Sequence, residues 1–167
     1  MTPLNNDHLE DYEALIAALN EHRVEFMIVG AYAVGLHGYI RATMDIDIFV
    51  NHEPRNASRV SAALKDFNGV KVNPKEIKKN TMIELGKEPN SLHIITNITG
   101  VEWKKAWKSR VQSGLGNQPA AFISKECLIE NKRATGRNKD NLDLIGLGAE
   151  PAKTKEKKKS RGQDLEL

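Results

Sequence analysis

Two aspartates one residue apart, Asp45 and Asp47, lie in a segment that is otherwise rich in Ile, Phe and Val. Residues 44–50 alternate in hydrophobicity, which predicts a β-strand with both carboxylates on one face. Carboxylates in apolar surroundings need a partner, and Mg²⁺ prefers such oxygen ligands and commonly bridges to substrate phosphates. The spacing therefore indicates a shared metal ion, although an Asp-x-Asp pair at a strand edge is often only a solvated face.

A glycine precedes this strand at a place where a ligand commonly approaches the backbone. Gly30 lies between a short apolar run, Glu25–Val29, and a segment with a helical pattern, Ala31–Leu36. Glycine lets the backbone approach a ligand without interference from a Cβ, and free N–H groups at a helix start favour phosphate. Alone, such a glycine is usually a turn. Together with the two aspartates it predicts a site for a triphosphate and its metal.

The segment Val29–Val50, VGAYAVGLHGYIRATMDIDIFV, is similar to the motif of the nucleotidyltransferase superfamily, a glycine loop followed by two aspartates separated by one hydrophobic residue. It resembles more closely the bacterial family of AbiEii-like and minimal nucleotidyltransferases (MNT-like). The positions that fit this family are Gly30, Ala33, His37, Gly38, Arg41, Thr43, Asp45 and Asp47. A second signature of the family is similar to Leu128–Leu144, LIENKRATGRNKDNLDL. The resemblance covers roughly residues 8–147.

The resemblance implies a fold, an activity and partners. The fold would be α/β (α+β), of the nucleotidyltransferase (DNA polymerase beta-like) type, with a mixed β-sheet flanked by helices. The activity would be metal-dependent transfer of a nucleotidyl group from an NTP to a hydroxyl of RNA (tRNA) or protein, with Mg²⁺ or Mn²⁺ as cofactor. Relatives often belong to toxin–antitoxin pairs, so the chain would be a toxin with an antitoxin as its partner.

The same resemblance assigns roles to individual residues. Asp45 and Asp47 would be the metal ligands, and Gly30 with the backbone at Ala31 would cradle the nucleotide phosphates, Ala31 standing where relatives have Gly or Ser. The residues that would contact or orient phosphate elsewhere are Arg41 and Thr43 before the acidic strand, and Lys132, Arg137 and Lys139 near the C-terminal helices.

Some of these residues also have ordinary structural explanations. His37 is predicted to be a hydrogen-bonded structural histidine. Lys132 and Arg133 are equally well explained as solvated helix charges. Arg137 would then pair with Asp140 or Asp143 and brace the last two helices.

A departure from the family concerns the third acid of the site. The stretch Pro89–Val101, PNSLHIITNITGV, has His93 where relatives carry an aspartate that helps hold the metal and acts on the attacking hydroxyl. An imidazole can ligate Mn²⁺ or Zn²⁺ or act as a base, but Mg²⁺ prefers oxygen, so phosphoryl chemistry should be weakened. Two hypotheses therefore remain: an enzyme in which His93 is a surrogate base or ligand, and a degenerate nucleotidyltransferase that is a nucleotide-binding or regulatory partner.

Helical and strand patterns alternate along the remaining chain, which predicts an α/β layer fold with a mixed sheet. Helices are predicted at residues 8–22, from 54 onward, and at 102–111, 124–135 and 140–147; strands at 25–29, 44–50, 70–72, 82–85, 92–96 and 121–123; and a loop at 114–119. Gly136 is a predicted C-cap. Trp103 and Trp107, one turn apart, favour core packing or a partner surface over a base-stacking platform.

Composition indicates one domain, residues 1–150, followed by a disordered Lys-rich tail, residues 151–167. The tail holds six of the 25 basic and three of the 22 acidic residues, so the other 150 residues carry 19 of each and have no net charge. The tail is expected to be solvated, or else to bind a polyanion. A single cysteine, no apolar run of the ~20 residues that span a bilayer, and a polar N-terminus predict a cytoplasmic protein without membrane contact.

Overall fold

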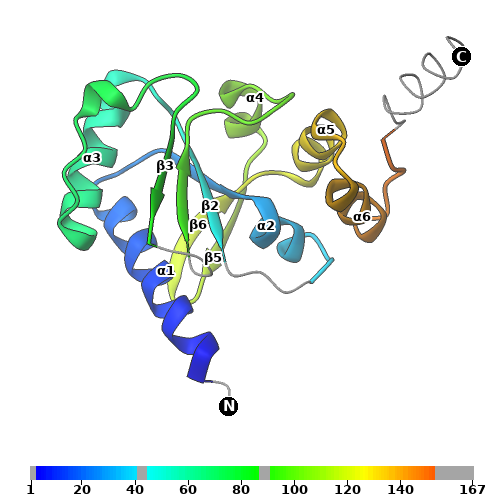
Figure 1. The fold of residues 1–167 in the computed structure, drawn as a ribbon, viewed down its shortest axis with the longest axis horizontal. Helices are drawn as coiled ribbons and strands as arrows, with labels where there is room; N and C mark the ends of the chain where they lie inside the picture. The colour runs from blue at the N-terminus through cyan, green and yellow to red at the C-terminus, as the bar shows by residue number, and fades with distance from the viewer. Residues whose placement is uncertain (1–2, 41–44, 87–90, 153–167) are drawn as a thin grey trace, which may run out of the picture.

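The computed structural model describes residues 3–40, 45–86 and 91–152, and the side chains from residue 9 onward. A six-stranded sheet in the order β3-β4-β2-β1-β6-β5 forms its centre (Figure 1). The strands are β1 (Phe26–Val29), β2 (Ile46–Val50), β3 (Met82–Leu85), β4 (Leu92–Ile95), β5 (Val111–Leu115) and β6 (Gln118–Phe122). The helices are α1 (Pro3–Glu21), α2 (Gly30–Leu36), α3 (Pro54–Asn68), α4 (Trp103–Lys108), α5 (Lys125–Thr135) and α6 (Asn138–Gly146), with a 3-10 turn, η1, at Pro74–Glu76.

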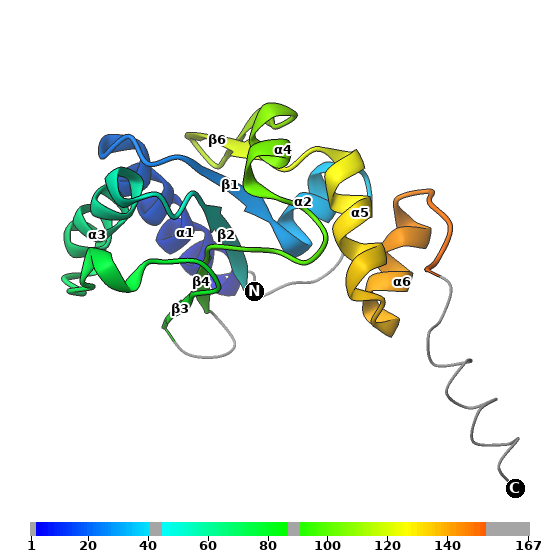
Figure 2. The same ribbon diagram turned by 90° about the horizontal axis from the view of Figure 1, so that it is seen from above.

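The sheet is mixed, as predicted. β2 pairs in parallel with β4, and β1 pairs in parallel with β6, whereas the other neighbours are antiparallel. Helices α1 and α3 pack against each other at one end of the molecule. At the other end α5 packs on α2, and α6 lies beyond α5 (Figure 2). The α/β fold with helices around a mixed sheet is therefore confirmed.

The central strand β2 separates the core from a polar face. Ile46, Ile48 and Val50 are fully buried, as the alternation of the sequence predicts. On the other face Phe49 is also buried, because the ring of Trp103 packs edge-on against it at a centroid distance of 5.0 Å. Only the N-terminal half of this face, beginning at Asp45, is left for polar groups.

The two tryptophans form a stack that belongs to this packing. The rings of Trp103 and Trp107 lie 5.1 Å apart and nearly parallel, and the Arg110 guanidinium covers Trp107 at 3.7 Å. The Trp103 ring and the Arg110 guanidinium thus both pack against the Trp107 ring. Both tryptophans pack against the core, so their predicted packing role is confirmed.

Two local predictions are wrong around residue 111. The predicted helix 102–111 ends at Lys108, where the Ser109 hydroxyl bonds back to the carbonyls of Lys105 and Ala106. The chain then turns into β5, and residues 114–119 form the end of the β5–β6 hairpin instead of a loop. Gly116, with φ +58°, makes the turn. The Gly and Pro residues of 114–119 therefore mark the end of the hairpin, but they do not indicate that the residues around the turn pair as strands.

Other boundaries follow from local chemistry. Residues 70–72 do not form the predicted strand. Ser124 caps α5 by accepting a hydrogen bond from the Cys127 amide, and Gly136 ends it with φ +64°, as predicted. Within the described ranges, none of the helices has the length and apolar character needed to cross a membrane.

Candidate functional site

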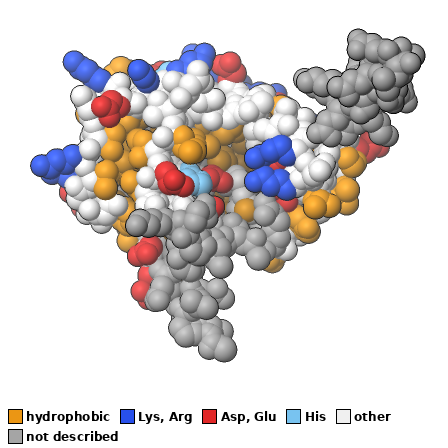
Figure 3. All heavy atoms as spheres, in the orientation of Figure 1, with side chains coloured by type: hydrophobic (Ala, Val, Ile, Leu, Met, Phe, Trp, Pro, Cys, Tyr) orange, Lys and Arg blue, Asp and Glu red, His pale blue; other side chains and the backbone are white. Residues whose placement is uncertain are grey.

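A cavity of about 880 Å³ lies where β1 ends and β2 begins, facing α5 and α6. Figure 3 shows histidine and acidic side chains gathered at the centre of this face, with basic side chains beside them. The predicted site residues that line the cavity are Gly30, Ala31, Asp45, Asp47, His93, Lys132, Arg137 and Lys139. The other two, Arg41 and Thr43, lie outside the described residues. The structure thus brings together residues from both ends of the chain.

Gly30 and Asp47 are in direct contact. The antiparallel register of β1 and β2 sets Val29 opposite Asp47, so the next residue, Gly30, lies beside the carboxylate. A Cβ on Gly30 would lie 2.2 Å from Asp47 Oδ2, and Gly30 has φ +67°, a backbone conformation that side chains disfavour. Glycine is therefore required here for two reasons, the backbone angle and the space beside the acid.

Asp45 and Asp47 line the same cavity, as their spacing predicts. Both are partly exposed, whereas Ile46 between them is buried. Oδ1 of Asp45 accepts a hydrogen bond of 3.1 Å from the amide of Ser91, the residue just before β4. This bond orients the first acid toward β4, the strand that carries His93.

His93 lies between two carboxylates. In the parallel register of β2 and β4 it is opposite Asp47, and in the antiparallel register of β3 and β4 it is opposite Glu84. Its Nδ1 lies 2.8 Å from Asp47 Oδ1, and its Nε2 lies 3.0 Å from Glu84 Oε2. The three side chains form a row across neighbouring strands, 32%, 16% and 48% exposed for Asp47, His93 and Glu84.

Glu84 did not emerge from the sequence as a site residue. Its only signal is its place on a short strand, and the alternation of that strand does not reveal its pairing partner. The register of β3 on β4 is needed to place it beside His93.

The row favours the protonated form of the imidazole. Burial lowers the pKa of His93, but hydrogen bonds to Asp47 and Glu84 and the nearby charges of Asp47 and Asp45 outweigh burial, so the pKa is raised. A protonated ring can donate one N–H to each of the two carboxylates, which is why the row favours that form.

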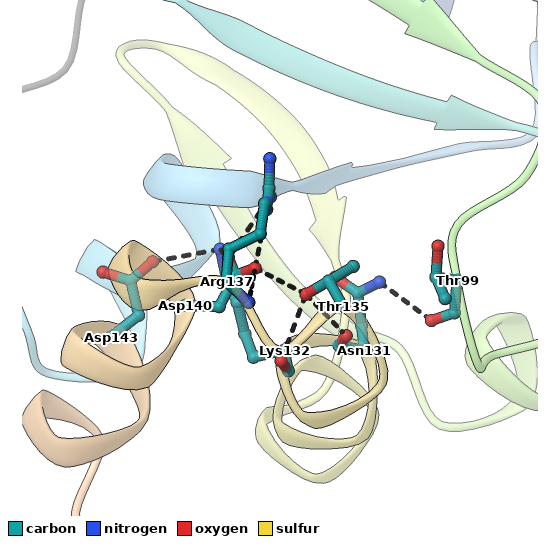
Figure 4. A network of polar contacts seen from close by, with 7 residues as sticks. All are labelled: Thr99, Asn131, Lys132, Thr135, Arg137, Asp140 and Asp143. Carbon is teal, nitrogen blue, oxygen red and sulfur yellow. Dashed lines mark hydrogen bonds and ion pairs between the residues drawn. The ribbon is translucent and has the colours of Figure 1, made fainter. Parts of the chain in front are cut away.

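Helices α5 and α6 form the opposite wall through a buried polar network (Figure 4). Lys132 Nζ lies 3.2 Å from Asp140 Oδ1 and 3.0 Å from Asp143 Oδ2, and its side chain is only 7% exposed. The interpretation of Lys132 as a solvated helix charge is therefore wrong, because ordinary solvated lysines are not buried between carboxylates. Its neighbour Arg133 is exposed.

Asp140 is the centre of that network. It accepts hydrogen bonds from Thr135 Oγ1 at 2.6 Å and from Arg137 Nε at 2.8 Å, in addition to the Lys132 contact. Burial raises the pKa of Asp140, but the bonds from Arg137, Thr135 and Lys132 prevail and hold it well below its usual range. The predicted pairing of Arg137 with Asp140 is confirmed.

Two basic side chains of this wall remain accessible. Arg137 is 58% exposed although it binds Asp140, and its remaining N–H groups can donate to a ligand. Lys139 is exposed and also lines the cavity. A bond of 2.9 Å from Asn131 Nδ2 to the Thr99 carbonyl ties this wall to the loop after β4.

His37 has a structural place. Its Nε2 lies 2.8 Å from the carbonyl oxygen of Ile123, so the ring joins the end of α2 to the residue after β6. The structural interpretation of His37 is confirmed, and this contact holds α2, and with it Gly30, against the sheet.

The donors in the cavity suit a cation that arrives with a phosphate ligand. Among the residues that the structure describes, no three acidic, histidine or cysteine side chains are grouped so as to hold a metal ion by themselves. Asp45 and Asp47 nevertheless present carboxylates to one cavity. Mg²⁺ in phosphoryl-transfer sites is commonly bound by one or two carboxylates, with substrate phosphates and water as its other ligands. The residues present fit that arrangement.

Comparison with known proteins bears on the fold. Neither a protein-family model nor a curated protein sequence matches the chain. Among solved structures, it is similar to the crystal structure of an antigenic nucleotidyltransferase-like protein from Paracoccidioides brasiliensis, with 15% identity over 84% of this chain and 75% of the other, and a TM-score of 0.52. A similarity at this low identity supports a conclusion about the fold alone. The chain therefore has a nucleotidyltransferase-like fold.

Proposed function

We propose that this protein transfers a nucleotidyl group from an NTP to a hydroxyl of RNA or protein, with a divalent metal ion. The observation that supports this most is the convergence of Gly30, Asp45 and Asp47 on one cavity whose opposite wall carries Arg137 and Lys139. Carboxylates that can bind a cation and basic side chains that can bind phosphates thus face each other across a cavity large enough for a nucleotide.

Each wall has its own task in this proposal. Gly30 leaves room for the Asp47 carboxylate at the cavity wall, and Arg137 and Lys139 donate hydrogen bonds to the outer phosphates. The ammonium of Lys132 is already bound by Asp140 and Asp143. We therefore assign Lys132 to holding α5 and α6 together, so that it supports phosphate binding indirectly.

A cation held by Asp45 and Asp47 would neutralise phosphate charge and polarise the α-phosphoryl group. The acceptor oxygen then forms a bond to the α-phosphorus, the bond to the β-bridging oxygen breaks, and pyrophosphate leaves. The hydroxyl proton is accepted at Asp47 and a proton is released at Glu84, the half-exposed end of the Asp47–His93–Glu84 row.

A second candidate function is nucleotide binding without transfer, in a regulatory partner. One observation favours it: both ring nitrogens of His93 are bonded to carboxylates, so neither faces an acceptor hydroxyl. Such a protein would bind NTP and metal in the same cavity and leave the acceptor unmodified.

Covalent labelling distinguishes the two functions. The protein is incubated with each labelled NTP, Mg²⁺ or Mn²⁺, and total tRNA or cell extract. Transfer predicts label on RNA or protein that is lost in Asp45→Asn and kept in Asp11→Asn, an exposed acid on α1. Metal-dependent nucleotide binding by calorimetry without label supports the regulatory function, and absence of both label and binding refutes the shared site.

The toxin role is a further part of the proposal. If the labelled acceptor is an essential RNA or protein, induced expression in bacteria should arrest growth. Asp45→Asn should relieve the arrest, whereas Asp11→Asn should not. Equal growth inhibition by wild type and Asp45→Asn would contradict a toxin that acts by transfer.

A further inference from the structure

We propose that a second cavity beside the first one binds single-stranded RNA, and that this RNA is the acceptor of the nucleotidyl group. The inference rests on the proposed function and deepens it, because the proposed function leaves open whether the acceptor is RNA or protein. Lys79, Lys104 and Lys108 bind the RNA phosphates, and bases or riboses lie against Trp103 and Trp107.

The second cavity has a volume of about 1110 Å³ and is lined by α4, by the segment after η1 and by the ends of β2 and β4. Asn97 and Ile98 line both this cavity and the first one, which holds the two aspartates. The chain after β4 runs toward α5 and then turns back to α4 (Figure 2), and the bond from Asn131 to Thr99 holds it there. An RNA strand that passes over Asn97 and Ile98 therefore reaches from the second cavity to the acids of the first.

Two lysines of α4 project into this cavity. Lys104 and Lys108 are exposed and lie four residues apart, so they share one face of the helix, and both line the cavity. The residue between them in the helical turn, Lys105, is instead directed toward α5, where it pairs with Glu130 at 2.7 Å. Within the described part of the chain, neither Lys104 nor Lys108 is paired with an acid. Their ammonium groups are therefore available to an anion.

A third lysine comes from a turn that is fixed in place. Thr96, buried at the end of β4, donates its hydroxyl to the Lys78 carbonyl at 2.7 Å and accepts from the Thr81 amide at 2.8 Å. Lys79 and Asn80, between these two anchor points, are exposed and line the cavity. The turn thus presents an ammonium and an amide group in a set position before a ligand binds, which lowers the entropic cost of binding.

The charge of this region differs from that of the whole body, which is neutral. Residues 74–81 and 102–110 together hold seven basic and two acidic residues. Three acids also line the cavity, but Glu25 and Glu53 belong to a different wall, formed by the start of β1 and the residues after β2, and Glu25 already accepts a hydrogen bond of 2.8 Å from Asn51. The third, Glu102, is the N-cap of α4. The wall formed by α4 and the turn therefore attracts a polyanion such as RNA more than a protein surface of mixed charge.

The two tryptophans supply the apolar part of the site. Trp103 and Trp107 are half-buried, so their packing on the core leaves part of each indole at the cavity that they line. Proteins that bind single-stranded nucleic acids combine basic side chains for the backbone with aromatic side chains for the bases. The amides of Asn51, Asn80 and Asn97 also line the cavity, and amides can hydrogen-bond base edges and the 2′-hydroxyl. The cavity therefore has the components of a site for single-stranded RNA.

The test measures RNA binding by the full chain in the presence of Mg²⁺ and a non-hydrolysable NTP. A single-stranded RNA of mixed sequence, about twelve nucleotides long, carries a fluorophore at its 5′ end, and anisotropy gives the affinity at several salt concentrations. Each phosphate that is neutralised adds about 0.7 to the slope of log K against log salt. The variant Lys79→Gln/Lys104→Gln/Lys108→Gln should therefore bind RNA more weakly, with a slope about 2 less steep than that of the wild type, and should keep its NTP affinity in calorimetry.

A control variant removes the same charge elsewhere. Lys65, Lys71 and Lys125 are exposed and line neither cavity. The variant Lys65→Gln/Lys71→Gln/Lys125→Gln should keep the RNA affinity and the salt slope of the wild type. Equal loss of slope in the two triple variants would show that net charge, and not the cavity, binds the RNA, and would overturn the inference.

Tryptophan emission gives a measurement that needs no variant. Trp103 and Trp107 are the two tryptophans of the chain, and both line the second cavity. RNA bound there should change their emission with the same dissociation constant that anisotropy gives. RNA held instead by Arg137 and Lys139, or by the Lys-rich tail, would leave the emission unchanged and overturn the inference.

The outcomes separate this inference from the function beneath it. If the wild type binds NTP but transfers label to protein and not to RNA, or does not bind the RNA, the inference is overturned and the proposed function stands. If the wild type binds no NTP, the proposed function is overturned, and the acceptor role of the RNA with it. Circular dichroism of each variant shows whether lost binding reflects unfolding.

Discussion

At the scale of single residues, the site depends on contacts between positions far apart in the sequence. Gly30 and Asp47 are separated by sixteen residues, yet the β1–β2 pairing places them in contact. The sequence identifies both as site residues by type and spacing. It does not reveal that the Asp47 carboxylate leaves no space for a side chain at position 30, because this contact follows from the register of β1 and β2.

Gly30→Ala should therefore lower the free energy of unfolding by more than the substitution of another glycine with positive φ would. The φ of +67° alone costs about 1–2 kcal/mol for a residue with a Cβ, and the Cβ also conflicts with Asp47 Oδ2. We expect loss of metal-dependent NTP binding in calorimetry together with a lower free energy of unfolding in urea.

Gly69→Ala is the matched control. Gly69 has φ +76°, but a Cβ added there would point into open space, with no non-neighbouring heavy atom of the described residues within 4 Å. The variant should lose about 1–2 kcal/mol of stability and keep NTP binding. Equal binding by the two variants would show that contact with Asp47 has no part in the site.

At the scale of elements, buried ion pairs join α5 and α6, because Lys132 of α5 lies between Asp140 and Asp143 of α6. The polar side chains of this contact come from the segment Leu128–Leu144. From the sequence, Lys132 could equally be a phosphate contact or a solvated charge. Periodicity does not show which of the two adjacent charged residues, Lys132 or Arg133, faces inward. The structure buries Lys132 and exposes Arg133.

Lys132→Met should destabilise the helix pair strongly. The change takes the ammonium away from the buried carboxylates of Asp140 and Asp143, and breaking a buried ion pair by removing one partner costs about 3–5 kcal/mol. Arg133→Met, on the same turn but exposed, should change stability by less than about 0.5 kcal/mol. Urea unfolding of both variants measures the difference, and similar losses would contradict the assigned pairing.

The same network predicts how stability varies with acid. Because the pKa of Asp140 is lowered in the fold, its contribution is fully present above the unfolded value of 3.8 and is lost as the pH falls toward the lower folded value. The free energy of unfolding of the wild type should fall between pH 5 and pH 2 more steeply than that of Asp140→Asn. Asp11→Asn should follow the wild-type slope, and parallel curves for all three would refute the assignment.

At the scale of the whole molecule, the sequence predicts the element order and the mixed sheet well, because β2 and the helices have clear periodicity and caps. Prediction from sequence fails where the local composition indicates a loop but the residues pair as strands. The β5–β6 hairpin contains Gly114, Gly116 and Pro119, which indicate a loop, but the ladder from Val111 to Leu115 is formed nonetheless. Glu84 is missed for a similar reason, since cross-strand neighbours are a property of the sheet and not of the local sequence.

The boundary between the domain and its C-terminal segment can be tested directly. The proposed division at residue 150 cuts close to two contacts: Arg133 donates to the Glu150 carbonyl, and the Ala152 amide donates to Asn141. The sequence beyond them has only two large apolar residues, Leu165 and Leu167, too few to bury much surface. A chain ending at Ala152 should therefore match the full chain in free energy of unfolding within about 0.5 kcal/mol and in NTP affinity.

A chain ending at Gly148 should be less stable, because it loses both contacts to α5 and α6. A large loss on removing residues 153–167 alone would instead show that the segment belongs to the folded unit.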